Sequence, residues 1–289
     1  MFLDDKVTNF SLNKKINIKG NLFSLDKPKV MGILNVTDDS FFDGGSYNTF
    51  DKAIKRAEDI VEQGADIIDI GACSTRPGAK LVDKQEECER LLPVIKEIKR
   101  RFPNIPISVD TVWAEVVEKV ANCGADIIND ISGGMFDEKM FDEVAKQKLP
   151  YILMHTNTTP DRMQKEIHYD NLFEDMCKYF SEKIDTLRQK GVIDIILDLG
   201  FGFGKTVDMN YFLLAHQKDF SMFSLPILTG ISRKSMMYKP LNTTPQAIQS
   251  ETMFLHAFAL ENGADILRVH DVKTTVNCLK LYDLYTTNK

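Results

Sequence analysis

Six hydrophobic runs in this 289-residue chain stop abruptly at a polar side chain that could hydrogen-bond a ligand. The runs span residues 30–35, 66–69, 107–110, 126–129, 151–155 and 193–198, and they end in Asn35, Asp69, Asp110, Asn129, His155 and Asp198. A carboxylate or amide at the end of a buried strand is costly unless it meets a partner or a ligand. The repetition of this pattern indicates a binding site built from strand ends.

A later run ends in Arg268 and His270, which lie two positions apart. Because side chains alternate along a strand with a period of two, both are expected to project from the same face. Phosphate sites in barrels of parallel strands commonly lie near the last two strands. A histidine by itself is more often a satisfied structural residue, but the neighbouring Arg268 favours an anion site.

Strand-like runs alternate with helical stretches from residue 30 onward, and two later runs at residues 225–229 and 264–269 bring the number of strands to eight. The expected helices span residues 50–64, 84–102, 111–124, 137–147, 171–190, 210–216, 246–263 and 273–285. This repeated order predicts a parallel sheet. Eight units in one chain favour a closed (β/α)8 TIM barrel over a doubly wound sheet.

Residues 7–25 alternate between apolar and polar types, which predicts a short N-terminal β-hairpin that covers the barrel floor. We therefore expect one domain over residues 1–289, with residues 1–28 as the hairpin extension. The tripeptide Gly-Ala-Asp recurs at residues 64–66, 124–126 and 263–265, where each glycine is expected to end a helix just before a strand. The long loops at residues 37–48 and 71–84 are expected at the opposite rim, where such loops usually bind ligands.

The composition excludes several classes of protein. A formal net charge of −6 argues against nonspecific nucleic-acid binding, which needs a basic surface. The sequence contains neither the apolar run of about 18 residues that a membrane helix needs nor a signal peptide, which predicts a cytoplasmic enzyme. The five cysteines are scattered and form no CxxC pair, so reduced thiols are expected.

Several motifs occur in a fixed order along this framework. They read NVTDDSFFDGG at residues 35–45, DIGACSTRPGA at 69–79, VDT at 109–111, INDISGG at 128–134, MH at 154–155, DLGFGFGKT at 198–206, GISRKS at 230–235 and RVHDV at 268–272. Together they closely resemble the motifs of the dihydropteroate synthase family, in the same order. The resemblance extends from about residue 30 to residue 272.

Members of that family are transferases of folate biosynthesis, which condense 6-hydroxymethyl-7,8-dihydropterin diphosphate with p-aminobenzoate to give 7,8-dihydropteroate and pyrophosphate. The resemblance implies that the pterin ring contacts six side chains, namely those of Asp110, Asn129, Ile131, Met154, Asp198 and Lys234. In this set Asp198 would accept the paired N–H donors of the ring, because a carboxylate can bind two donors at once. Ile131 and Met154 would be walls.

The diphosphate requires positive charge and hydrogen-bond donors, and Arg268 and His270 are expected to supply them. The resemblance adds Asn35 as a contact to the diphosphate and to a bound Mg²⁺. It also places Asp43 near the methylene carbon, where a carboxylate would offset the positive charge that develops as pyrophosphate leaves. A strong general base is not expected, because an arylamine is already nucleophilic at neutral pH.

For p-aminobenzoate, the resemblance implies a ring held between Phe203, Pro77 and the stem of Lys234, with its carboxylate near Ser235. Thr75 and Arg76 are expected to close the second loop over this substrate. The expected catalytic residues are Asp43, Thr75, Arg76 and Lys234. The family further implies competition by sulfonamide mimics of p-aminobenzoate and a homodimer formed through the later helices.

Three single positions and the segment at residues 156–159, TNTT, depart from the usual family pattern. Asp38 and Leu199 stand where proline is usual, and Cys73 stands where glutamate is usual. Because proline fixes φ, the first two changes are expected to alter loop rigidity. Cys73 is expected to be a small loop residue rather than a reactive thiol.

Three other functions compete with this interpretation. A methyltetrahydrofolate methyltransferase would also hold a pterin with Asp and Asn, but it needs a corrinoid partner and has no diphosphate site. A paralogue that binds pterin without turnover would act as a partner or regulator, and the intact loop motifs argue against it. A Schiff-base aldolase would use Lys234, and borohydride trapping with a carbonyl substrate would identify it.

Overall fold

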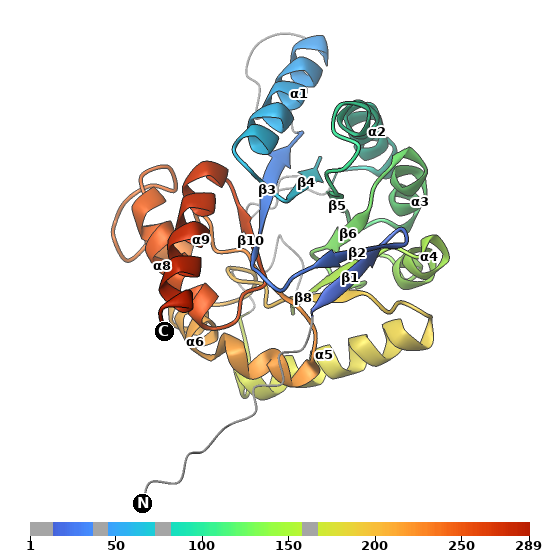
Figure 1. Ribbon diagram of the computed structural model, residues 1–289. Helices are drawn as coiled ribbons and strands as arrows, with labels where there is room; N and C mark the ends of the chain where they lie inside the picture. Colours follow the sequence, from blue (N-terminus) through green and yellow to red (C-terminus); the bar gives the residue numbers. More distant parts are fainter. Residues whose placement is uncertain (1–13, 37–45, 73–81, 158–166) are drawn as a thin grey trace, which may run out of the picture.

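A computed structural model describes residues 14–36, 46–72, 82–157 and 167–289, and within them eight parallel strands form a closed barrel (Figure 1). The strands are β3 (Lys29–Asn35), β4 (Ile67–Gly71), β5 (Ile107–Asp110), β6 (Ile127–Asp130), β7 (Tyr151–Met154), β8 (Ile195–Asp198), β9 (Ile227–Thr229) and β10 (Ile266–Val269). Each pairs in parallel with its neighbour in the chain, and β10 closes the ring on β3. The predicted TIM barrel is confirmed.

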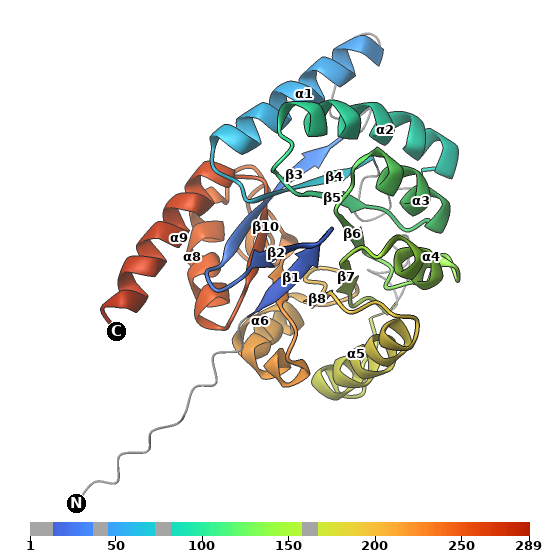
Figure 2. The same ribbon diagram turned by 45° about the vertical axis from the view of Figure 1, so that its right-hand side comes forward.

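Helices surround the barrel on its outer side, as Figure 2 shows. They are α1 (Ser46–Glu62), α2 (Lys84–Arg101), α3 (Ala114–Cys123), α4 (Met140–Gln147), α5 (Leu172–Gln189), α6 (Val207–His216), α8 (Gln249–Glu261) and α9 (Val272–Thr287). A large apolar core fills the space between these helices and the outward faces of the strands. The short helices η2 (Gln217–Phe223) and α7 (Ser235–Tyr238) were not predicted, because elements this short carry too little periodicity to detect.

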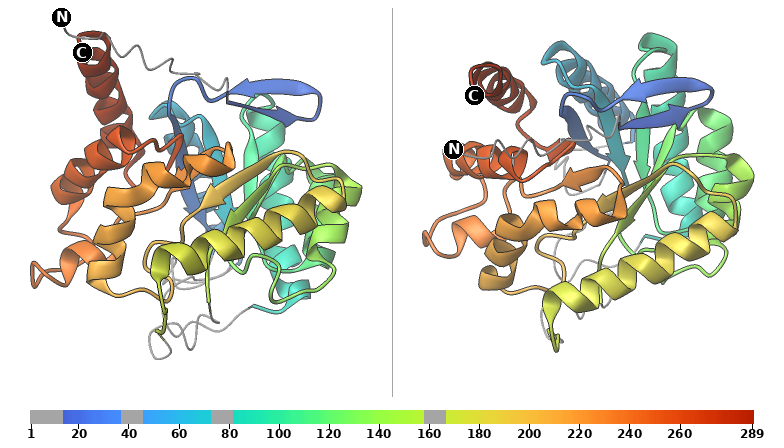
Figure 3. Two further views of the ribbon diagram at one scale, coloured as in Figure 1. Left: turned by 90° about the horizontal axis from the view of Figure 1, so that it is seen from below. Right: turned by 60° about the horizontal axis from the view of Figure 1, so that its bottom comes forward.

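The N-terminal hairpin closes one end of the barrel. It consists of β1 (Lys15–Ile18) and β2 (Asn21–Ser24), which pair antiparallel and lie across that end in Figures 2 and 3. Its buried residues Ile16, Ile18 and Leu25 pack against the first inward-facing layer of the barrel, which contains Met31, Ile67, Ile127, Ile152, Ile196, Leu228 and Ile266. The expected floor is confirmed, and ligands must enter from the other end.

The three Gly-Ala-Asp turns form this same floor with one repeated arrangement. Asp66, Asp126 and Asp265 each accept a hydrogen bond from a backbone N–H near the start of a neighbouring strand, at 2.9, 2.9 and 2.8 Å. Each carboxylate also pairs with a lysine on the floor side. These aspartates therefore fasten one strand to the next far from the open end.

Alternation along the strands places polar residues directly above the apolar floor. Strands β10, β4, β6 and β8 are every second strand around the barrel, and such strands contribute to a common inner layer. They supply Ile266, Ile67, Ile127 and Ile196 to the floor layer. Two residues further on, where side chains again point inward, they supply Arg268, Asp69, Asn129 and Asp198.

Candidate active site

A pocket opens above this polar layer at the carboxyl ends of the strands. Its lining consists of Asn129, Ile131, Met154, Asp198, Phe203, Gly230, Lys234 and Arg268. The apolar members Ile131, Met154 and Phe203 belong to a small cluster of their own, together with Val112. The pocket thus has an apolar side and a rim of hydrogen-bonding groups.

Arg268 is held in place by two carboxylates from distant parts of the chain. Its Nε lies 2.6 Å from Oδ2 of Asp69, and its Nη2 lies 3.0 Å from Oδ2 of Asp110. Burial opposes the charge of this guanidinium, but the two aspartates raise the pKa of Arg268, which therefore stays protonated. Burial raises the pKa of Asp110, and Arg268 acts in the opposite direction.

Asp198 and Lys234 are two further ionisable residues of the pocket, and each influences the pKa of the other. Burial raises the pKa of Asp198, while Lys234 and the backbone N–H of Gly200, which donates to its Oδ1 at 2.8 Å, counteract this effect. Burial lowers the pKa of Lys234 to about 8, and Asp198 acts in the opposite direction. A negative group and a positive group thus lie on one pocket wall, where each can meet a complementary edge of a polar ring.

The turn between β8 and α6 carries Phe203 into the pocket. Gly200 has φ +66°, and a Cβ at this position would lie 2.0 Å from the carbonyl oxygen of His155, so only glycine fits. Lys234 donates a hydrogen bond to the carbonyl oxygen of Phe201, and its Nζ lies 4.6 Å from the centre of the Phe203 ring. The glycine-rich run therefore shapes a turn that presents an aromatic face.

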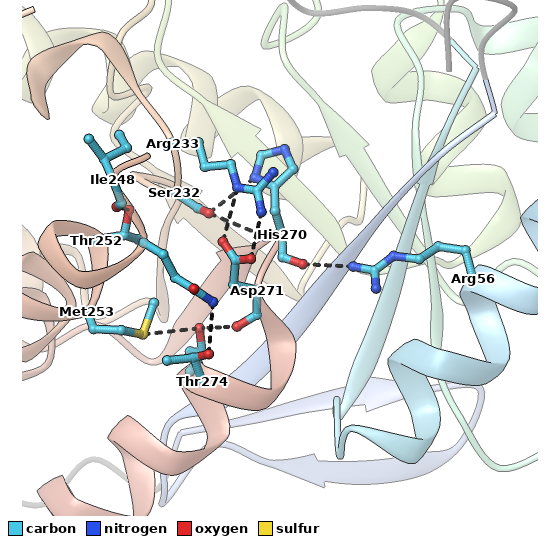
Figure 4. A network of polar contacts seen from close by, with 11 residues as sticks. Arg56, Ser232, Arg233, Ile248, Thr252, Met253, His270, Asp271 and Thr274 are labelled. Carbon is cyan, nitrogen blue, oxygen red and sulfur yellow. Dashed lines mark hydrogen bonds and ion pairs between the residues drawn. The ribbon is translucent and has the colours of Figure 1, made fainter. Parts of the chain in front are cut away.

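His270, two residues beyond Arg268, is oriented by the loop that follows β9 (Figure 4). Its Nδ1 lies 3.1 Å from Oγ of Ser232, and its carbonyl oxygen accepts a hydrogen bond from Arg56 on α1 at 2.7 Å. Burial and the charges of Arg268 and Arg233 lower the pKa of His270 to about 4. In the free protein His270 is thus a neutral hydrogen-bonding group, whereas Arg268 carries the positive charge.

Arg233 points toward Asp271, the residue just before α9 (Figure 4). Its Nε and Nη2 donate to the two carboxylate oxygens of Asp271 at 3.0 and 2.6 Å. Its backbone adopts φ +57°, which is unfavourable for a residue with a side chain. This ion pair fixes the loop immediately before Lys234 and Ser235.

The structure gathers most of the pterin residues that the sequence suggested. Asn129, Ile131, Met154, Asp198 and Lys234 all line the pocket, and Asp110 lies behind Arg268. Three further residues lie nearby without lining it: Asn35 is exposed at the end of β3, Ser235 begins α7, and His270 follows β10. Four lie outside the described residues: Asp43, Thr75, Arg76 and Pro77.

Two residues that shape the site were given no role from the sequence. Asp69 ended one of the hydrophobic runs. The period-two alternation of side chains along the strand already placed it on the inner face of the barrel, as it did Asn129 and Asp198. Lys205 is buried beneath the turn that carries Phe203, and a lysine in a glycine-rich loop gives no sign of such burial.

The groups that line the pocket suit a flat polar heterocycle beside an anion. Acceptors are available at Asp198 and at Oδ1 of Asn129, donors are available at Lys234 and Arg268, and the apolar side can cover a ring face. The charge of Arg268 suits a phosphate group attached to such a ring.

Comparison with known proteins agrees with this geometry. The sequence profile of the family described as pterin binding enzyme matches residues 31–270. The dihydropteroate synthase of Escherichia coli strain K12 is 43% identical over 271 residues, which cover 93% of this chain and 95% of the relative. The dihydropteroate synthase of Bacillus subtilis strain 168 is 40% identical over 260 residues, which cover 89% of this chain and 88% of the relative.

Solved structures show the same relationship. The chain superposes on Yersinia pestis dihydropteroate synthase in a sulfonamide drug complex with a TM-score of 0.89, at 41% identity, covering 94% of this chain and 99% of the other. It superposes on Xanthomonas albilineans dihydropteroate synthase with 4-aminobenzoic acid with a TM-score of 0.88 and 34% identity. This match covers 95% of this chain and 98% of the other.

Proposed function

The chain belongs to the pterin-binding enzymes, among the dihydropteroate synthases, and on that premise we propose how its barrel performs their reaction. The reaction joins 6-hydroxymethyl-7,8-dihydropterin diphosphate to p-aminobenzoate and releases pyrophosphate, a step of folate biosynthesis. The observation that carries the proposal is the convergence of Asn129, Asp198, Lys234 and Arg268 on one pocket.

The pterin ring occupies the pocket with its hydrogen-bonding edges toward the polar layer. Asp198 accepts the ring N–H and the 2-amino group, which form a donor pair that suits a carboxylate. Lys234 serves the acceptor side of the ring, while Asp110 and Asn129 serve the remaining edge. Ile131 and Met154 contact the ring faces, which is supported by their place in the apolar lining.

The diphosphate lies toward Arg268, whose guanidinium offers charge and several N–H donors. His270 adds a hydrogen bond rather than a positive charge, because its imidazole is neutral in the free protein. Departure of pyrophosphate leaves positive charge on the methylene carbon and the pterin ring. The catalytic demand is therefore to stabilise opposite charges at two neighbouring places. Asp43 is the proposed counter-charge for the methylene.

The second substrate, p-aminobenzoate, approaches from the side of Phe203 and Lys234. An aromatic ring can stack on Phe203, and the aliphatic stem of Lys234 provides a second apolar contact. Ser235 is the proposed donor to its carboxylate. Pro77 completes the ring site, and Thr75 and Arg76 close over it.

Magnesium is the proposed cofactor, with Asn35 as its protein ligand. The fit rests on the chemistry of the donors, because Mg²⁺ favours oxygen ligands and commonly binds through one or two protein groups and substrate phosphates. Asn35 is exposed at the end of β3, where its amide oxygen is accessible. When bound, the ion would neutralise charge on the departing pyrophosphate.

A homodimer formed through the later helices is the proposed assembly. Large apolar side chains are exposed on α6 and α8, including Phe254 at 64% and Phe258 at 47%, and the rings of these two stack edge to face. A second copy of the chain would cover such a face. Phe254→Glu should produce monomers in light scattering, whereas Leu22→Glu on the hairpin should leave the assembly unchanged.

The cytoplasm is the proposed location. The four described cysteines, Cys88, Cys123, Cys177 and Cys278, are free thiols, which suits a reducing compartment. No helix in the described part of the chain is long and apolar enough to span a membrane.

A coupled assay for pyrophosphate tests the activity directly. Release should require both the pterin diphosphate and p-aminobenzoate, and dihydropteroate should accumulate in equal amount. If the pterin diphosphate binds in the presence of Mg²⁺ but no product forms, the chain is a pterin-binding protein rather than an enzyme.

A further inference from the structure

Asp69 is completely buried and joins two side chains of the pocket that come from opposite directions. Its Oδ2 lies 2.6 Å from Nε of Arg268 on β10 and 3.2 Å from Nδ2 of Asn129 on β6. Its Oδ1 lies 3.4 Å from the same Nδ2. Strand β4, which carries Asp69, is two strands away from each of these partners. A single carboxylate thus connects the anion side of the pocket to the ring side.

The contact with Asp69 decides which end of the Asn129 amide faces the ligand. Nδ2 of Asn129 donates to both carboxylate oxygens of Asp69, so the NH₂ group of Asn129 points toward Asp69. Its Oδ1 then points elsewhere, and this buried oxygen has no hydrogen-bond partner among the described residues. A buried acceptor without a partner is costly, and a ligand N–H would satisfy it.

The same carboxylate orients the guanidinium of Arg268. Nε is directed to Asp69 and Nη2 to Asp110, which fixes the plane of the group and leaves Nη1 and the outer N–H groups for an anion. Lysine could not reproduce this arrangement, because its ammonium has no planar set of donors.

We propose that Asp69 is a positioning residue that simultaneously holds Asn129 as a hydrogen-bond acceptor for the pterin ring and Arg268 as a donor for the diphosphate. The proposal rests on the function proposed above and deepens it. It identifies the ligand group that contacts Asn129 as an N–H group. It also means that one buried carboxylate sets the relative positions of the residues that bind the pterin ring and the diphosphate.

Calorimetric titration with two ligands tests this role, namely phosphate-free 6-hydroxymethyl-7,8-dihydropterin and its diphosphate. Asp69→Asn should weaken binding of the phosphate-free pterin about tenfold, since the Asn129 amide is then free to turn. It should weaken binding of the diphosphate about a hundredfold, because the charged hydrogen bond between residue 69 and Arg268 is also lost. Asp126→Asn, a buried floor carboxylate, is the matched control and should leave both affinities unchanged.

A charge swap separates the two tasks of Asp69. In Asp69→Asn/Asn129→Asp, residue 129 again presents only acceptor atoms to the ring and residue 69 supplies the NH₂ group. Affinity for the phosphate-free pterin should return to within about threefold of wild type, while the added affinity due to the diphosphate stays lost. Arg268→Lys tests the orientation of the guanidinium. This variant should bind the diphosphate about tenfold more weakly and the phosphate-free pterin as tightly as wild type does.

Two results would overturn the role of Asp69. In the first, Asp69→Asn loses both affinities only in proportion to a fall in melting temperature, as a structural carboxylate would, and the swap restores neither. In the second, Arg268→Lys matches wild type for both ligands, a result that does not depend on the folding of the Asp69 variants. Wild-type protein that binds neither ligand would instead refute the proposed function.

Discussion

The amine of Lys205 lies 3.1 Å from Nδ1 of His155, and both residues are buried beneath the turn that presents Phe203. Lys205 also donates to the carbonyl oxygens of Gly200 and Phe203, each at 3.0 Å. Burial lowers the pKa of Lys205 to about 7 and lowers the pKa of His155 well below its usual value. The pair therefore supports the pocket wall from behind.

Lys205→Met should loosen the Phe203 turn while preserving the buried volume. The carbonyl oxygens of His155, Gly200 and Phe203 lose their donor, so the free energy of unfolding should fall by about 3 kcal/mol in urea denaturation. The KM for p-aminobenzoate should rise about tenfold, more than the KM for the pterin diphosphate, because Phe203 is proposed to contact the former. Thr206→Ala removes the N-cap of α6 at the adjacent position. It should lower the free energy of unfolding by about 1 kcal/mol without this effect on KM. Equal changes in both KM values would contradict the role of the turn.

Pterin affinity should depend on pH through Lys234. Its pKa is lowered to about 8, so it is mostly charged at pH 7 and mostly neutral at pH 9. The charged form is the stronger donor to the acceptor side of the ring, so affinity for dihydropterin should decrease as the pH rises through about 8. Calorimetry between pH 6.5 and 9.5 measures this slope. Lys234→Met should bind more weakly and lose this decrease in affinity, and an unchanged slope in this variant would assign the titration to another group, such as Asp110, whose pKa burial raises to about 8.

Arg268→Ala should affect both stability and binding. It leaves Asp69 and Asp110 as buried carboxylates without their cation, which should lower the free energy of unfolding by about 3 kcal/mol at neutral pH. Binding of the pterin diphosphate should weaken about a hundredfold, whereas phosphate-free dihydropterin should be nearly unaffected. Denaturation and calorimetry on the same preparation check the two effects. Equal loss for both ligands would refute the assignment of Arg268 to the diphosphate.

The Arg233–Asp271 ion pair should hold an unfavourable backbone conformation. Arg233→Ala and Arg233→Gly both remove the ion pair, but glycine accepts φ +57° at lower cost. Arg233→Gly should therefore be more stable than Arg233→Ala by about 1 kcal/mol. Both variants should raise the KM for p-aminobenzoate, because Lys234 and Ser235 follow directly in the chain. If alanine proves as stable as glycine at this position, the backbone is not held under strain by the ion pair.

The sequence by itself determined the barrel and the identity of most pocket residues. Strand periodicity is a local property, and a polar residue at the end of a buried strand is visible without a partner. For this reason the floor hairpin, the eight strands and the strand-end residues Asn129 and Asp198 could be predicted, whereas Lys234 came from the resemblance to the family motifs. The same alternation placed Arg268 and His270 together, but it did not show that His270 turns to Ser232 and is neutral.

Only the tertiary structure decided which charges meet. Asp69 and Arg268 are 199 positions apart, and their contact depends on the closure of β10 onto β3 and on the layer that alternate strands share. Long side chains such as Lys205 and Arg233 can point toward or away from a pocket from the same backbone position. Their direction follows from buried carbonyls and carboxylates on other elements, and these partners are brought near only when the barrel is closed.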